Sequence, residues 1–141
     1  MTDIVVDGSV AVKWFVPELH SKAALRLLRE SVGLGAPEII LAEVGNVLWK
    51  KWRRGEIEPA AVPEMMIDFR KIPLHLFDTD YLFMDAWDIA KNYSRSFYDS
   101  LYVALAVRNN CRMVTADLKL FNLLKATSLK KHILWIEDIP K

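Results

Sequence analysis

The chain alternates short apolar runs rich in β-branched residues with longer stretches in which apolar positions recur every three or four residues. The first pattern is typical of buried strands, and the second is typical of amphipathic helices. Strands are predicted at residues 4–7, 38–41, 72–77, 112–115 and 132–135. Helices are predicted at residues 9–15, 20–32, from the end of the second strand to 54, 59–69, 81–93, 96–108 and 117–125.

Local signals set the expected boundaries of these elements. We expect Ser9 and Asp80 to cap the helices that follow them, Gly33–Gly35 to break the second helix and Gly55 to end the third. Pro73 should confine its strand to a sheet edge or be the first residue of that strand. Because strands and helices alternate, we expect right-handed crossovers around a mainly parallel sheet. The 141 residues contain no linker or repeat and predict a single domain, a three-layer α/β/α sandwich.

The overall composition is more apolar than a soluble monomer needs. Hydrophobic residues make up 52% of the chain and the mean hydropathy is +0.12. This excess predicts further apolar surface that is buried in an oligomer or against a partner. The net charge is only +1, so no global field attracts nucleic acid and any contact with RNA or DNA must be local.

The sequence carries signals of compartment as well. The single cysteine, Cys111, precludes an intramolecular disulfide and fits a reducing compartment. No signal peptide is recognisable, and no apolar stretch approaches the length of a membrane span. We therefore expect a cytoplasmic protein without a membrane partner.

Four acidic residues stand where strand-like runs give way to helix-like stretches, namely Asp7, Glu43, Asp99 and Asp117. In a layered α/β fold, the segments just beyond the carboxyl ends of the strands converge on one crevice, so these carboxylates should meet there. Like charges at close range raise each other's pKa unless a cation neutralises them. Oxygen-rich carboxylate sites suit Mg²⁺ or Mn²⁺. The pattern therefore points to metal-dependent chemistry on phosphate.

Each acid also has a purely structural alternative. Asp7 could end its strand in an Asx-turn, and Glu43 could be an ordinary solvent-facing helix residue. Asp99 fits a capping box and Asp117 fits a simple N-cap. Glu43, however, has no basic residue four positions further on, and Asn46 on the same helix face could orient a ligand or a water molecule.

Other functional motifs are weaker. No His or Cys spacing suggests zinc, and the scattered glycines form no phosphate-binding loop. The basic run at residues 50–54 is interpreted as a solvated helix end, with an RNA-gripping strip that includes Trp52 as the alternative. Met65, Met66 and Phe69 share a face that could form a partner groove, although a core position is the default.

Four blocks of the sequence resemble one known family in the expected order and spacing. They are VVDGSVAVKWFVPE around Asp7, LAEVGNVLWK around Glu43, FYDSLYVALA around Asp99 and VTADLKLF around Asp117. Together they span nearly the whole chain and resemble the PIN-domain ribonucleases, specifically the VapC-type toxins. Many relatives carry Ala or Thr at the position of Gly8.

The resemblance implies a five-stranded parallel sheet with helices on both faces and an acidic pocket that binds Mg²⁺ or Mn²⁺. It also implies endonucleolytic cleavage of RNA, a homodimer, and neutralisation by a cognate antitoxin whose tail lies across the pocket. By motif position, Asp7, Glu43, Asp99 and Asp117 match the family's acidic quartet. Ser9 and Thr115 match the hydroxyl positions that accompany it.

These inferences combine into one hypothesis, hydrolysis of RNA phosphodiesters with two metal ions, one of which the substrate could complete. Asp7 would be the shared ligand, Asp99 and Asp117 would hold the metal that generates hydroxide, and Glu43 would hold or orient the second metal or accept a proton through water. Ser9 and Thr115 would fix the carboxylates. The alternatives are a PIN nuclease of RNA processing, an inactive PIN-like scaffold that binds RNA or protein, and a phosphotransfer domain with an aspartyl acceptor.

Overall fold

The computed structural model describes residues 1–29 and 31–141, and within this part of the chain five strands form one sheet in the order β3-β2-β1-β4-β5. All neighbouring strands pair in parallel. The strands are β1 (Ile4–Val6), β2 (Leu34–Pro37), β3 (Leu74–Phe77), β4 (Arg112–Thr115) and β5 (Ile133–Trp135). Ile4 pairs with Leu34 on one side and with Arg112 on the other. The carboxyl end of β1 therefore opens between β2 and β4, in the middle of the sheet.

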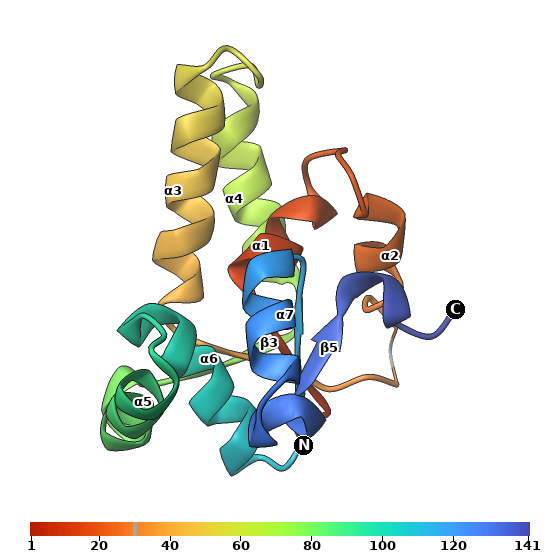
Figure 1. Ribbon diagram of the computed structural model, residues 1–141. Coiled ribbons are helices and arrows are strands. Elements are labelled where there is room, and N and C mark those ends of the chain that lie inside the picture. Colours follow the sequence, from red (N-terminus) through yellow and green to blue (C-terminus); the bar gives the residue numbers. More distant parts are fainter. Residues whose placement is uncertain (30) are drawn as a thin grey trace.

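Helices cover both faces of this sheet, which confirms the predicted three-layer α/β/α sandwich (Figure 1). Figure 1 also shows that α3 and α4 lie side by side and extend away from the sheet. The helices are α1 (Gly8–Ala11), α2 (Ser21–Leu25), α3 (Ile40–Arg53), α4 (Ala61–Lys71), α5 (Thr79–Tyr93), α6 (Phe97–Arg108) and α7 (Leu118–Lys125).

Helix α6 lies at the centre of the core. It packs against β1, β2 and β4, and α5 covers its other side. Its residues from Ser100 to Ala106 are all buried, so this helix is apolar around most of its circumference, as expected for a helix enclosed on both sides. Its first turn is thereby held rigidly next to the end of β1.

The second strand differs from the prediction. The predicted strand at 38–41 is instead a turn and the beginning of α3, where Ile40 is fully buried as a helix residue. Gly35, expected to break a helix, lies inside β2. A Cβ atom at Gly35 would come within 2.6 Å of the Thr2 side chain, so the close approach of the N-terminal segment requires glycine there.

The predicted helix at 20–32 is wrong beyond its beginning, since α2 covers only Ser21–Leu25 and residue 30 lies outside the described residues. The N–H groups of Leu27 and Leu28 each donate to a carbonyl three residues earlier, which produces turns in place of a continued α-helix. Leu27 is nevertheless buried, so the apolar pattern identified the inward side of this segment but not its length.

Two predicted caps are also wrong. Helix α1 begins at Gly8, and the Ser9 hydroxyl inside it donates to Asp7 instead of capping the helix. Helix α5 begins at Thr79 after Asp78, which places Asp80 in its first turn. A cap position depends on where the preceding strand ends, and a one-residue error there moves it.

Other boundaries are confirmed. Pro73 directly precedes β3, which is an edge strand, and β4 spans the predicted residues 112–115. Ser96 caps α6 by accepting a hydrogen bond from the N–H of Asp99 at 3.1 Å. In the described part of the chain, none of the helices combines the length and the apolar character needed to cross a membrane.

Candidate active site

Asp7 follows the central strand β1, and its side chain is only 7% exposed. One carboxylate oxygen, Oδ2, accepts hydrogen bonds from Ser9 Oγ at 2.7 Å and from Thr115 Oγ1 at 2.9 Å. These bonds come from residues on two different elements, so they fix the rotamer of the carboxylate and satisfy one of its oxygens in the protein interior.

The two hydroxyl groups also bind the segment that leaves β4. Ser9 Oγ accepts from the Ala116 N–H at 3.2 Å, and Thr115 Oγ1 accepts from the Asp117 N–H at 3.0 Å. The exit of β1 and the exit of β4 are thereby joined by side chain to backbone hydrogen bonds. Both hydroxyl residues that the sequence singled out lie next to Asp7.

Asp117 is the N-cap of α7, as its structural alternative proposed, because its Oδ1 accepts from the Leu120 N–H at 3.1 Å. The cap and a role in the site are compatible, since capping holds one oxygen of the carboxylate while the residue stays at the end of β4. Of the four acids, Asp7 directly follows β1 and Asp117 lies two residues beyond the end of β4.

Glu43 and Asp99 reach the site differently from the prediction. Glu43 lies in the first turn of α3, and Asp99 lies in the first turn of α6, which follows α5 and not a strand. A Cβ atom on Gly8 would lie 3.5 Å from Glu43 Oε2 and 3.6 Å from the Tyr102 hydroxyl. Glu43 is therefore adjacent to the residue that follows Asp7, and an alanine at position 8 would fit with ordinary contacts.

Electrostatic coupling joins the four acids. Burial raises the pKa of Asp7 to about 6 against the hydrogen bonds from its two hydroxyl partners, and the charges of Asp99 and Asp117 raise it further. Burial also raises the pKa of Glu43 to about 7, with the charges of Asp7 and Asp99 acting in the same direction. Asp99 has a raised pKa as well, chiefly from burial and in part from Asp117. Asp7, Glu43 and Asp99 therefore each lie in the field of at least one other acid of the set.

The donor set fits a hard divalent cation in chemistry but is not a ready-made cage. Glu43 Oε1 and the Tyr102 hydroxyl are buried and make no well-formed hydrogen bond among the described residues. The Tyr102 hydroxyl is nevertheless close enough to Glu43 to lower the pKa of its carboxyl group against the effect of burial, so the two groups satisfy each other in part. In the same part of the chain, no three Asp, Glu, His or Cys side chains are arranged so that they could hold a metal ion. The carboxylates converge on one region but would have to move closer to share a cation.

Asn46 and Tyr102 differ in their relation to the acid site. Asn46 is exposed one turn beyond Glu43 on α3, and no hydrogen bond connects it to the acids within the described residues. Tyr102 was missed, although it is one turn after Asp99 on α6. The signal that could have identified it is the position of a phenol three residues after a candidate ligand in an otherwise apolar helix.

Comparison with known proteins shows the family of the chain. The family model for the PIN domain matches residues 4–125. Ribonuclease VapC3 of Pyrobaculum aerophilum is 30% identical over 121 residues, which cover 83% of this chain and 91% of that protein. Ribonuclease VapC9 of Mycobacterium tuberculosis is 32% identical over 117 residues, which cover 83% and 87%.

Two solved structures share the fold. The crystal structure of PAE2754 from Pyrobaculum aerophilum superimposes with a TM-score of 0.67 at 22% identity, covering 96% of this chain and 85% of that one. A toxin–antitoxin complex from Klebsiella pneumoniae gives a TM-score of 0.59 at 12% identity, with coverage of 84% and 90%. The chain belongs to the PIN domain family, and its relatives place it with the VapC ribonucleases of that family.

The raised pKa of Glu43 predicts that the acid site destabilises the metal-free protein at alkaline pH. The folded pKa of about 7 lies above the ordinary value of 4.5, so stability from this group is fully present below about pH 4.5 and is lost as the pH rises through 7. Glu43→Gln cannot ionise and therefore avoids this loss of folding stability. With the pKa shift discounted for solvent screening, the variant should be more stable than the wild type at pH 8 by about 1 kcal/mol, or about 3 °C in Tm. Thermal denaturation with EDTA at pH 8 and pH 4.5 measures the difference, which should vanish at the lower pH.

The matched control is Glu64→Gln, because Glu64 is an exposed acid on α4. It removes the same charge without touching the acid site, so its Tm should follow that of the wild type at both pH values. Equal melting temperatures of Glu43→Gln and the wild type at pH 8 would contradict the raised pKa of Glu43 in the folded protein.

Proposed function

We propose that this chain is a metal-dependent endoribonuclease of the VapC type, the toxin of a toxin–antitoxin pair. The observation that carries the proposal is the convergence of four acids from separate parts of the chain, three of which, Asp7, Glu43 and Asp99, have pKa values raised by burial and by the charges of neighbouring acids. A cluster of this kind is expensive to maintain in a fold and is typical of a functional site. The ribonuclease names of the relatives support RNA as the substrate.

Each acid has a role in the proposed reaction. Asp7, Asp99 and Asp117 would hold Mg²⁺ or Mn²⁺, and Glu43 would complete the ligand set or accept a proton from water at Oε1. When bound, a divalent ion of this type lowers the pKa of water and stabilises the charge that develops on the phosphate. Ser9 and Thr115 position Asp7 through the two hydrogen bonds to its Oδ2.

The place of action follows from the proposed substrate. We infer that the protein works in the cytoplasm, where RNA is available and where the free thiol of Cys111 would stay reduced.

Asp99→Asn should abolish cleavage while it preserves the fold, because it removes the charge of a proposed ligand and keeps the shape of the side chain. We expect RNA cleavage in Mg²⁺ to fall by at least about 100-fold, the upper end of what the loss of a mere supporting partner costs. The stabilisation by Mg²⁺ in a thermal shift assay should also disappear. Asp88→Asn is the matched control, since Asp88 is an exposed acid on α5. Cleavage by Asp99→Asn at the wild-type rate would disprove the role of Asp99.

An exposed apolar face on α5 supports the proposed homodimer. Phe83, Met84 and Trp87 are each more than half exposed, and they follow one another at helical spacing on the same side of α5. Large apolar side chains gathered in this way mark a protein interface. Tyr98 near the start of α6 is also more than half exposed.

Trp87→Glu should convert the dimer to a monomer, because it places a charge in the apolar interface. Light scattering coupled to size exclusion measures the mass, and a value near the chain mass of 16.2 kDa is expected for the variant. Trp49→Glu on α3 is the control that should remain dimeric. A wild-type protein that is already monomeric at micromolar concentration would rule out the homodimer.

A second apolar surface supports the proposed antitoxin partner. An open groove of about 370 Å³ lies between α3 and α4, and its lining is almost entirely apolar. Of the face singled out in the sequence, Met66 lines this groove, while Phe69 is buried in the core. Grooves of this type accept the apolar side of an amphipathic segment. The groove is lined by Gly45, Trp49, Trp52, Pro59, Val62, Pro63 and Met66.

Trp49→Glu should abolish co-purification with an antitoxin encoded next to this chain, because the groove would lose an apolar wall and gain a charge. Trp87→Glu should still co-purify with it, which makes the two tryptophan variants reciprocal controls for the two interfaces. Unchanged binding by Trp49→Glu would place the antitoxin on another surface.

A further inference from the structure

A second, basic pocket adjoins the acid site. Its volume is about 380 Å³, and Ser9 and Ala116 form part of its wall. The same Ser9 hydroxyl donates to Asp7 Oδ2 and accepts from the Ala116 N–H. The pocket and the acid site therefore share a wall. The charged residues that line the pocket are Lys13, Glu18, Lys50, Lys51 and Arg54.

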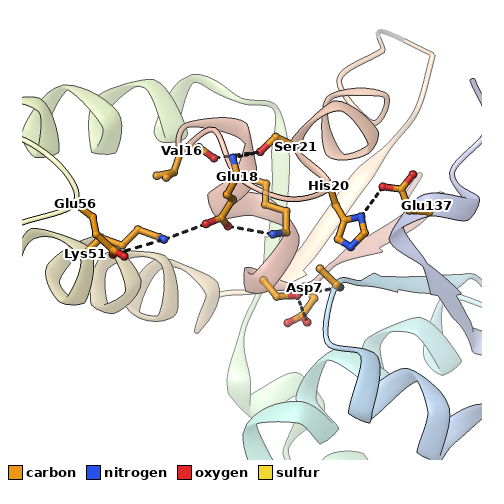
Figure 2. A network of polar contacts seen from close by, with 11 residues as sticks. Asp7, Val16, Glu18, His20, Ser21, Lys51, Glu56 and Glu137 are labelled. Atoms are coloured by element: carbon orange, nitrogen blue, oxygen red, sulfur yellow. Dashed lines mark hydrogen bonds and ion pairs between the residues drawn. The ribbon is translucent and has the colours of Figure 1, made fainter. Parts of the chain in front are cut away.

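Two of the lysines are held in place and largely removed from solvent. Glu18 Oε1 binds Lys13 Nζ at 3.1 Å, and Glu18 Oε2 binds Lys51 Nζ at 3.0 Å. The lysine side chains are only 11% and 17% exposed. Figure 2 shows the Glu18 network and Asp7 in one view. The interpretation of residues 50–54 as a merely solvated helix end is therefore wrong for Lys51.

The charge of this pocket is unbalanced. Glu18 lies between Lys13 and Lys51, and its pKa is lowered because these two lysines outweigh the effect of burial. Lys51 also lies 4.0 Å from Glu56 Oε2, which does not line the pocket, so four cations and one carboxylate line it. Lys50 and Arg54 line the same pocket, and neither forms an ion pair with another described residue. Long cationic side chains that converge on one cavity with surplus charge favour an anionic ligand.

A cluster of carboxylates cannot by itself attract a polyanion, and the net charge of +1 provides no general attraction. We propose that the basic pocket binds a backbone phosphate of the RNA strand next to the phosphate that is cleaved, with Lys13 and Lys51 at its base and Lys50 and Arg54 at its rim. Glu18 positions the two inner lysines and competes with the phosphate for them. This inference rests on the proposed function.

A simpler role for the network is that it only anchors the turn around Glu18 to α3. That role involves Lys13 and Lys51 and leaves Lys50 and Arg54 as solvated cations at the end of α3, where they would not contribute to RNA binding. The two roles also differ for Glu18, because an anchor is lost when Glu18 is neutralised, whereas a phosphate site gains free positive charge.

The test measures RNA binding in the Asp99→Asn background, so that no cleavage occurs. The probe is a fluorescently labelled single-stranded RNA of mixed sequence. Lys50→Ala with Arg54→Ala should weaken binding about 10-fold at low salt and reduce the slope of log K against log salt by about 0.7, as expected when one phosphate of a single strand is no longer neutralised. The control pair Lys91→Ala with Lys130→Ala removes two exposed charges elsewhere and should leave the slope unchanged.

Glu18→Gln provides the second arm. It should bind RNA several-fold more tightly than Glu64→Gln, which makes the same change of charge on α4. The Tm of Glu18→Gln should be lower than that of Glu64→Gln, because the ion pairs of Glu18 with Lys13 and Lys51 are lost. Unchanged or weaker binding by Glu18→Gln would support the simple anchor and overturn the phosphate site, as would an unchanged salt slope for the Lys50 and Arg54 pair.

The outcomes also separate this inference from the proposed function. RNA binding that depends on none of the pocket residues overturns the subsite alone. No RNA binding by the parent Asp99→Asn protein overturns both. Displacement of RNA by polyglutamate at equal charge concentration would assign the pocket to an acidic polypeptide and would also overturn the phosphate subsite.

Discussion

The buried carboxylate of Asp7, held by two hydroxyl groups, is the interaction on which the rest of the site depends. Removal of a carboxylate from water is costly, and the hydrogen bonds from Ser9 and Thr115 offset part of that cost. Because the same hydroxyls accept the N–H groups of Ala116 and Asp117, the ends of β1 and β4 cannot shift independently. The relative position of Asp7 and Asp117 is therefore a property of the sheet itself.

The fold maintains opposite charges on the two sides of Ser9. On one side, burial and, to a smaller extent, repulsion between neighbouring acids raise the pKa values of Asp7 and Glu43, and both effects oppose folding when these groups are charged. On the other side, surplus cations surround Glu18. The apolar helix α6 and the strands beneath it supply the stability that tolerates both. Functional sites commonly carry such local conflicts, which the surrounding structure outweighs.

Much of the fold follows from local signals. Strand β4 and helices α6 and α7 were predicted nearly to the residue, because a run of apolar residues or a capping side chain marks each boundary. Strand β2 was missed because Gly35 resembles a helix breaker in the sequence alone. Its structural reason is the close approach of Thr2, which is distant in sequence. The apolar run at 39–41 has the pattern of a strand, but it contains the first turn of α3, in which Ile40 is buried.

The candidate site was predictable to a similar extent. Convergence of the acids follows from parallel topology, even though two of them enter from first helical turns and not from strand ends. Tyr102 escaped detection because a phenol within an apolar helix resembles a core residue. The burial of Lys51 could not be predicted from the sequence either, because its partner Glu18 lies 33 positions away.

The two borders of the sheet restrict how copies of this chain can associate. On one border, Pro73 immediately precedes β3 and offers no N–H group, and on the other border β5 has only 3 residues. Short or proline-flanked edges are poor templates for pairing with a strand of another molecule. Continuous sheets across subunits, and the fibres that grow from them, are therefore disfavoured, which leaves contacts between helical surfaces as the available means of assembly.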